Sequence, residues 1–255
     1  FAPMLGAAII LLADWRSIFL AFAIFAVVMC SWMGLRLPET LPVTERRPFR
    51  LPLLLGAVRE MFAHPTVRLS IMVQTLCLGL LFTLLTMVQP IYDLIFGRGD
   101  SFPFWFGFVA LMSGSASVLN AAIVVRVGMR RIVTWSLAAQ ILFSAVMLVL
   151  SGLSLPQTLM FGLFVSWQTT VFFMAGTTLG NLNAMAMEPM GHIAGMAASV
   201  TGAVSTVLAA GIAAIIGQFF DGTLIPLASG LLVMASLAFL LMLRMARVEA
   251  RLPAE

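Results

Sequence analysis

Lysine is absent from this chain of 255 residues, and charged residues of any kind make up only 9% of it. Hydrophobic residues make up 62%. A typical soluble domain has roughly 25% charged and 45–50% apolar residues, so this composition excludes an ordinary soluble protein and predicts an integral membrane protein. Only two cysteines are present, Cys30 and Cys77, and both lie within apolar runs, where a thiol behaves as a small hydrophobic group. We therefore expect no disulfide framework, no metal site and no cofactor.

Common catalytic motifs are also missing. The chain contains no HExxH motif, no phosphate-binding loop and no CxxC pair. An intramembrane protease would have to use Ser115 with a histidine as base, but His64 and His192 are predicted at a membrane surface and Ser115 about midway along a span. We predict that the protein is not an enzyme. The formal charge of +4 does not indicate nucleic-acid binding, because the basic residues flank apolar runs and form no basic face.

The apolar runs have the length of membrane-spanning helices, which need about 20 apolar residues. The chain begins inside an apolar run, without an initiator methionine or a charged segment. We therefore expect the first span to be the remainder of a longer helix and the chain to be a C-terminal fragment, not one that starts with a signal peptide. All-α integral membrane architecture is predicted, with eight spans, the first incomplete: residues 1–13, 17–35, 67–90, 104–125, 132–150, 157–179, 193–219 and 225–243.

The arginines predict the orientation of these spans. Loops rich in arginine stay in the cytoplasm. If the second span ends inside, then segments 36–66, 126–131 and 180–192 and the C-terminal tail are cytoplasmic, and the opposite side holds only Arg16 and Arg98. The twelve other arginines form three clusters: Arg36, Arg46, Arg47, Arg50, Arg59 and Arg68; Arg126, Arg130 and Arg131; and Arg244, Arg247 and Arg251.

One long polar segment, residues 36–66, separates the second and third spans. Its prolines and charges predict an interdomain linker between residues 1–35, which would be two helices of one half, and residues 67–255, which would be a six-helix half with its tail. Within the linker, residues 53–63 have the pattern of a short amphipathic helix at the membrane interface, with Arg59 and Glu60 on its polar side. A solvated connector is the alternative.

Several motifs resemble those of the major facilitator superfamily, in particular its Bcr/CflA group of drug and proton antiporters. Residues 2–7 resemble the end of the fifth-helix antiporter motif, and residues 126–131 resemble the C-domain copy of the family's Gly-Arg-rich loop. In the first motif the usual Gly-Pro and second glycine are altered; in the second the preceding aspartate is missing. The other matching stretches are DWRSIF at 14–19, LPETL at 37–41, NLNAMAMEPMGHIAG at 181–195 and QFFDGTLIPL at 218–227.

This resemblance implies twelve helices around a central cavity, of which the chain holds the fifth to the twelfth. It implies export of small organic or drug-like molecules by proton antiport with alternating access. It also implies a bacterial inner-membrane protein with lipid, substrate and protons as partners, monomeric when complete. A truncated product or a non-transporting membrane protein is the alternative. No acidic residue lies deep inside a span, so proton coupling rests on the resemblance alone, and the coupling carboxylate is expected upstream.

Polar side chains at membrane depth are costly and face protein or a water-filled cavity. Those that could line a substrate cavity have a competing role in helix packing, and for Asn120 a helix–helix hydrogen bond is the more expected. The cavity candidates are Gln74, Thr86 and Gln89 on the third span, Asn120 on the fourth, and Trp167, Gln168 and Phe172 on the sixth, of which Gln168 and Phe172 are expected to share a helix face.

A second set of residues is expected to act in gating. Glu188 and His192 lie four residues apart but are too few for a metal site. On the span 193–219, Ala198 and Gly202 form a small-xxx-small pair that predicts close helix packing. The gating candidates are Pro3, Gly6, Arg126, Gly128, Arg130, Arg131, Glu188 and His192.

Overall fold

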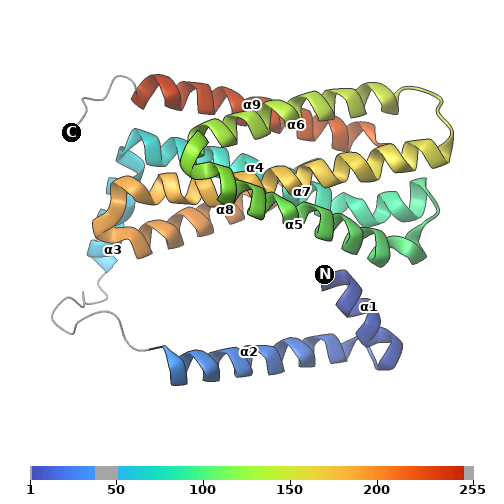
Figure 1. The fold of residues 1–255 in the computed structure, drawn as a ribbon, viewed down its shortest axis with the longest axis horizontal. Helices are drawn as coiled ribbons and strands as arrows, with labels where there is room; N and C mark the ends of the chain where they lie inside the picture. The colour runs from blue at the N-terminus through green and yellow to red at the C-terminus, as the bar shows by residue number, and fades with distance from the viewer. Residues whose placement is uncertain (1, 38–50, 250–255) are drawn as a thin grey trace.

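A computed structural model of the chain describes residues 2–37 and 51–249, and in these residues it contains helices and turns without a strand (Figure 1). Every predicted span contains one helix, so the all-α class is confirmed. The helices are α1 (Ala2–Leu12), α2 (Arg16–Arg36), α3 (Leu51–Ala63), α4 (Pro65–Pro90), α5 (Phe102–Val127), α6 (Met129–Ser151), α7 (Gln157–Met187), α8 (Ala194–Gly217) and α9 (Ile225–Glu249), with short π or 3₁₀ turns at Ile91–Ile95, Gly99–Ser101 and Glu188–Ile193.

Six stretches of the described chain are long and apolar enough to cross a membrane. One of them, Gln157–Gly217, contains two helices, α7 and α8, which meet at the turn Glu188–Ile193 and run in opposite directions (Figure 1). Helix α1 has only 11 residues and is too short to count as a span. The eight predicted spans therefore correspond to seven helices of spanning length and the shorter α1.

Helices α4 to α9 form one bundle in which α4 and α7 are central. Helix α4 packs against α7, α8 and α9, whereas α7 packs against α4, α5 and α6. Helices α6 and α9 also pack together, so they cover one side of the central pair. Helices α5 and α8 lie at the two flanks, where α5 is held mainly by α7 and α8 mainly by α4. A continuous apolar core runs along these contacts.

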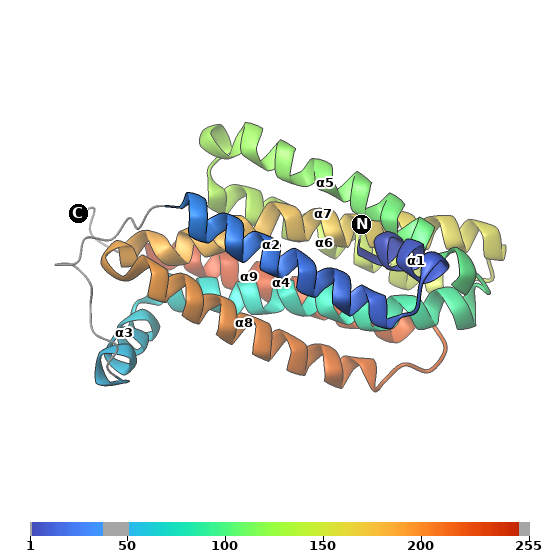
Figure 2. The ribbon, with the colours of Figure 1, turned by 90° about the horizontal axis from the view of Figure 1, so that it is seen from below.

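Helices α1 and α2 lie beside this bundle (Figure 1). Helix α1 packs against α5, and α2 has no buried residue. Large apolar side chains such as Phe19, Phe22 and Trp32 are more than 60% exposed on α2. A helix that is apolar all round needs lipid or other helices around it. Helix α3 coincides with the predicted amphipathic helix and projects at the end of the bundle where α7 and α8 meet (Figure 2).

Pro90 marks a change in helix type at the end of α4. Proline has no N–H to donate, which disturbs the hydrogen bonding of a helix around it. The chain continues directly into the π turn Ile91–Ile95, and the N–H of Ile91 is shared between the carbonyls of Met87 and Val88. At Pro90 the helix therefore changes its local pitch. This turn carries Tyr92, whose side chain is completely buried.

Helix α8 packs against α4 through small side chains. Ala198 and Gly202, which were predicted to make a close contact, lie outside the buried stripe of α8. A Cβ added at Gly202 would meet no atom within 4 Å. The small residues of α8 occupy several faces, so their spacing alone did not decide which face packs. The buried stripe is Ala197, Thr201, Ser205, Ala209 and Ala213.

Candidate functional site

The three candidates on α7 face three different helices. Trp167 Nε1 donates a hydrogen bond of 3.2 Å to Ser144 Oγ on α6. Phe172 makes an edge-to-face contact with Phe106 on α5, with ring centroids 5.4 Å apart. Gln168 faces the turn after α4. The expected common face of Gln168 and Phe172 is thus divided between two neighbouring helices, because four residues on a helix are 40° past a full turn and α7 packs on three sides.

Gln168 forms the polar centre of the bundle. Its side chain is completely buried, and its Oε1 accepts a hydrogen bond of 3.0 Å from the hydroxyl of Tyr92. Its Nε2 is also buried and has no hydrogen-bond partner among the described residues. An unpaired buried donor costs about 1–3 kcal/mol, so this amide is a candidate to bind an acceptor that the described residues do not supply.

An aromatic cluster surrounds Tyr92 at the end of the bundle opposite the turn Glu188–Ile193. Arg98, from the loop between α4 and α5, lies with its guanidinium 4.5 Å from the centre of the Phe161 ring. This cluster was not found from the sequence, because its members come from three segments whose aromatic residues are each unremarkable alone. Tyr92, Phe96, Phe102, Trp105, Phe161 and Phe164 belong to it through edge-to-face or tilted contacts.

The candidates on α4 have different environments. Gln74 is buried, and its Oε1 has no partner. Gln89 and Thr86 are exposed, and the Thr86 hydroxyl donates to the carbonyl of Thr83 at 2.9 Å. Thr86 also lines a cavity of about 300 Å³ between α4 and α8, together with Pro90. The structure therefore does not gather the three side chains into one site.

Asn120 makes the helix–helix hydrogen bond expected of it. Its Oδ1 accepts from Asn181 Nδ2 at 2.7 Å, which joins α5 to α7. Ser115, the serine of the protease hypothesis, donates from its Oγ to the carbonyl of Met112 in its own helix. The nearby Ser113 Oγ lies 2.7 Å from the carbonyl of Val109 in the same helix and 3.4 Å from that of Thr169 on α7. These contacts are typical of hydroxyls that satisfy themselves in an apolar helix.

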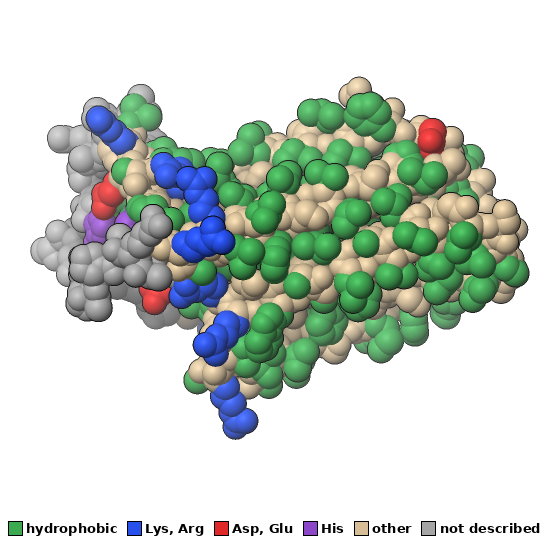
Figure 3. All heavy atoms as spheres, turned by 90° about the horizontal axis from the view of Figure 1, so that it is seen from above, with side chains coloured by type: hydrophobic (Ala, Val, Ile, Leu, Met, Phe, Trp, Pro, Cys, Tyr) green, Lys and Arg blue, Asp and Glu red, His purple; other side chains and the backbone are tan. Residues whose placement is uncertain are grey.

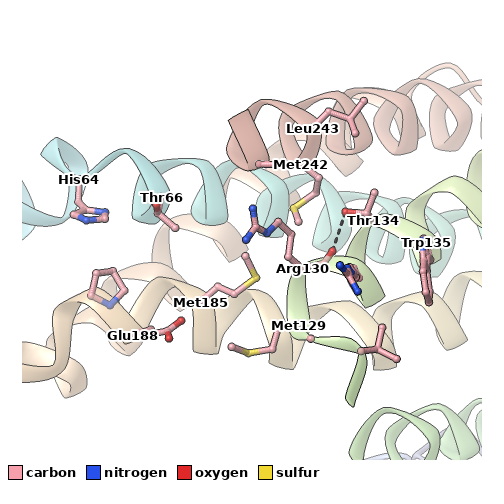
Figure 4. A pocket seen from close by; sticks show the side chains of 15 residues that line it. His64, Thr66, Met129, Arg130, Thr134, Trp135, Met185, Glu188, Met242 and Leu243 are labelled. Carbon is pink, nitrogen blue, oxygen red and sulfur yellow. Dashed lines mark hydrogen bonds between the residues drawn. The ribbon is translucent and has the colours of Figure 1, made fainter. Parts of the chain in front are cut away.

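Four gating candidates from two distant segments line one cavity, of about 760 Å³, which we call the arginine-end cavity (Figure 4). It lies at the end of the bundle where α4 begins and where the basic side chains gather (Figure 3). These candidates are Gly128, which joins α5 to α6, Arg130 and Arg131 in the first turn of α6, and Glu188, at the end of α7. Gly128 has a φ of 89°, a conformation that favours glycine and lets the chain turn sharply between the two helices. Arg126 is exposed and does not line the cavity.

His192 does not join Glu188. Its Nε2 lies 2.9 Å from Oε1 of Glu60, so the pair connects the turn between α7 and α8 to α3. Both side chains are about half exposed, and such a pair contributes at most about 1 kcal/mol to stability. Of the two candidates in α1, a Cβ on Gly6 would lie 3.7 Å from Ile18, and the Pro3 side chain is outside the described residues.

Comparison with known proteins agrees with this arrangement. The family model described as Major Facilitator Superfamily matches residues 1–217. The chain belongs to the major facilitator superfamily. It is 27% identical over 253 residues to the uncharacterized MFS-type transporter YdgK of Bacillus subtilis, with 93% of this chain and 60% of that protein covered. It is 25% identical over 229 residues to the bicyclomycin resistance protein homolog of Haemophilus influenzae, with 89% and 56% covered.

The chain thus spans less than two thirds of the length of either relative. No solved structure matches it. Membership of a transporter family, together with helices of spanning length, makes this a multi-pass membrane protein of the transporter class.

Proposed function

We propose that this chain forms part of a secondary transporter that exports small amphipathic organic molecules by proton antiport with alternating access. Family membership supports the transporter class. The relative named as a bicyclomycin resistance protein homolog supports a drug-like substrate. The proposal places the protein in a bacterial inner membrane with the arginine end in the cytoplasm, because arginine-rich loops stay on that side.

The observation that carries the substrate class is that each of the two central helices holds a buried amide with an atom unpaired among the described residues. Gln168 on α7 has an unpaired donor, Nε2, and Gln74 on α4 has an unpaired acceptor, Oε1. Aromatic side chains, Tyr92 and Phe172 among them, lie beside Gln168 or one turn away. Ligand sites combine apolar area with a few polar groups that fix orientation. A molecule with an apolar body and one donor or acceptor group matches this combination.

Proton coupling would use a group elsewhere in the protein. The carboxylates near the spans, such as Asp93 and Asp221, lie at the helix ends, and none of the cavity candidates titrates near neutral pH. A proton carrier must be reached alternately from both sides, which a residue at a helix end does not satisfy. Proton antiport therefore rests on the family resemblance.

The test is accumulation of a fluorescent lipophilic cation in proteoliposomes that contain the complete gene product, with and without an imposed proton gradient. Gln168→Ala is compared with Gln140→Ala as a matched control. Gln140 is also a buried amide with one unpaired atom, but it lies on α6 and bonds to Ser144 on the same helix. If Gln168 binds substrate, its replacement should raise the substrate concentration for half-maximal transport by roughly tenfold, the equivalent of one buried hydrogen bond.

Gradient-dependent dye exclusion that Gln168→Ala weakens and Gln140→Ala preserves would support the proposal. Equal effects of the two replacements would show that buried amides matter here only for packing. Dye exclusion without any dependence on the gradient would refute proton antiport but keep the transporter.

A further inference from the structure

The arginine-end cavity contains the start of helix α4. Helix α4 begins with Pro65, and His64 precedes it with extended backbone and no side-chain cap. The first N–H groups of a helix have no partner within the helix, and the aligned peptide dipoles give this end a partial positive charge. The cavity thus has the N-terminus of a 26-residue helix in its wall, which favours an anion.

Two side chains at this helix start have unused hydrogen-bonding capacity. Thr66 lines the cavity and is only 9% exposed, and its hydroxyl makes no hydrogen bond to another described residue. His64 also lines the cavity, and its Nδ1 is buried without a partner. Buried polar groups are almost always hydrogen-bonded, so the unpaired Nδ1 of His64, beside a Thr66 hydroxyl that bonds to no other described residue, points to a ligand that pairs with them.

The charges around the cavity favour an anionic ligand. Arg130 and Arg131 line it, and among the described residues of the lining Glu188 is the one acidic side chain. Basic side chains therefore outnumber acidic ones in the described lining. The carboxylate of Glu188 is exposed, whereas Thr66 is buried, so the acidic group lies nearer the rim than the hydroxyl. Arginine recognises phosphate oxygens with paired hydrogen bonds.

The remaining wall of the cavity is apolar and leads to the surface of the bundle. Met242 is buried within it, whereas Trp135 on α6 is 61% exposed and Leu243 on α9 is 36% exposed (Figure 4). Two of the arginines at this end of the bundle, Arg130 and Arg131, line the cavity, so it lies at the level of their side chains. Arginine and tryptophan are characteristic of the boundary between hydrocarbon and headgroups. The expected ligand is thus amphipathic, with its anionic part inside the cavity and its apolar part along the membrane-facing side chains.

We propose that the arginine-end cavity binds the phosphodiester headgroup of an anionic phospholipid. The phosphate oxygens accept hydrogen bonds from the Thr66 hydroxyl, from free N–H groups at the start of α4 and from the Arg131 guanidinium. The acyl chains leave the cavity past Trp135 and Leu243. Such a lipid would join the beginning of α4 to the loop between α5 and α6 and to the end of α9, three segments that the described hydrogen bonds do not connect.

The test measures the thermal unfolding midpoint of the purified, delipidated complete gene product against increasing concentrations of a short-chain phosphatidylglycerol. Phosphatidylcholine with the same chains and inorganic phosphate serve as comparison probes. A ligand that binds only the folded protein raises the midpoint in proportion to its saturation, so the series gives an apparent Kd. Phosphatidylglycerol is expected to stabilise the protein, and phosphatidylcholine and phosphate much less.

Arg131→Gln should raise the apparent Kd for phosphatidylglycerol by roughly tenfold to a hundredfold, the range for a charge-assisted hydrogen bond. Arg126→Gln is the matched control, because Arg126 is in the last turn of α5, close in sequence to Arg131 but outside the cavity. Thr66→Val, which keeps the shape of the side chain, should weaken binding several-fold. Equal effects of the two arginine replacements, or equal binding of phosphatidylcholine, would overturn the proposal. If inorganic phosphate alone gave the same stabilisation with the same dependence on Arg131, the site would be one for a free anion and the lipid assignment would be wrong.

Discussion

Replacing Gly176 with alanine should separate helices α5 and α7. A Cβ built on Gly176 would lie 2.9 Å from the Cβ of Ala116 on α5. Apolar carbons in contact normally lie about 3.5–4.0 Å apart, so the two atoms would overlap by more than half an ångström. Ala116 is completely buried and its Cβ has no rotatable bond, so the side chain cannot move away. Only a shift of one helix backbone can relieve the contact.

The expected cost follows from two opposing contributions. Insertion of a methyl group into a tightly packed contact costs about 1–3 kcal/mol. Alanine is also a better helix former than glycine, by about 0.5–1 kcal/mol, which offsets part of that cost. Gly180 lies four residues further along α7, and no atom lies within 4 Å of a Cβ at that position. Gly180→Ala therefore shows the propensity gain alone, and Gly176→Ala should be about 1–3 kcal/mol less stable than this control.

The unfolding of detergent-solubilised protein can be followed with a thiol-reactive fluorogenic dye. Cys77 is completely buried and reacts only when the bundle opens, whereas the exposed Cys30 is first replaced with serine. The double variant Gly176→Ala with Ala116→Gly moves the methyl group from one helix to the other and should recover most of the lost stability. The reasoning is refuted if Gly176→Ala is as stable as Gly180→Ala, or if the second replacement gives no recovery.

Three further changes test individual contacts. Tyr92→Phe removes the only hydrogen bond to Gln168 Oε1 from a described residue and should lower the free energy of unfolding by about 1–3 kcal/mol. The same replacement made in a Gln168→Leu background should cost less, and thermal unfolding of the single and double variants measures this coupling. His192→Ala breaks the pair with Glu60 and should increase hydrogen–deuterium exchange of residues 51–63 with little change in the global midpoint. Hydrogen bonds from the hydroxyl and the N–H of Thr223 lower the pKa of Asp221 from its ordinary 3.8. The protein with Asp221 should therefore be more stable than Asp221→Asn above pH 3.8, and this advantage should be lost as the pH falls below that value. Unfolding midpoints across a pH series check this sign.

The spans could be predicted from the sequence because their length and apolar character depend on the bilayer and not on the neighbours of each helix. The side-chain contacts between helices could not be predicted, because they depend on how each helix is rotated in the bundle. Trp167 and Gln168 are adjacent in sequence, yet they bond to α6 and to the turn after α4. The Asn120 bond was anticipated as a type of contact, but its partner Asn181 was not.

His192 shows how a turn can defeat a spacing argument. Residues four apart meet on an α-helix, and on that basis Glu188 was its natural neighbour. The segment Glu188–Ile193 is a 3₁₀ turn with non-helical backbone at Met190, so the two side chains no longer share a face. The turn instead directs His192 toward Glu60 on α3, a contact across 132 residues of sequence that no local pattern indicates.

The unpaired buried polar atoms of the described residues are concentrated on α4 and on α7 and α8, which pack against it. Among the described residues these atoms belong to Ser70, Gln74 and Thr83 on α4, Gln168 on α7 and Thr201 on α8, beside Gln140 on α6 and His64 at the start of α4. A bundle with a single resting arrangement would be expected to pair such groups, since each costs about 1–3 kcal/mol when left unpaired. Their concentration along the contacts of α4 with α7 and α8 agrees with a protein in which a substrate or a second arrangement of these helices supplies the missing partners. In the same bundle, the fully paired bond between Asn120 and Asn181 holds α5 to α7. A hydrogen bond also crosses the contact of α4 with α8, where Ser205 Oγ donates to the carbonyl of Ile71 at 3.4 Å.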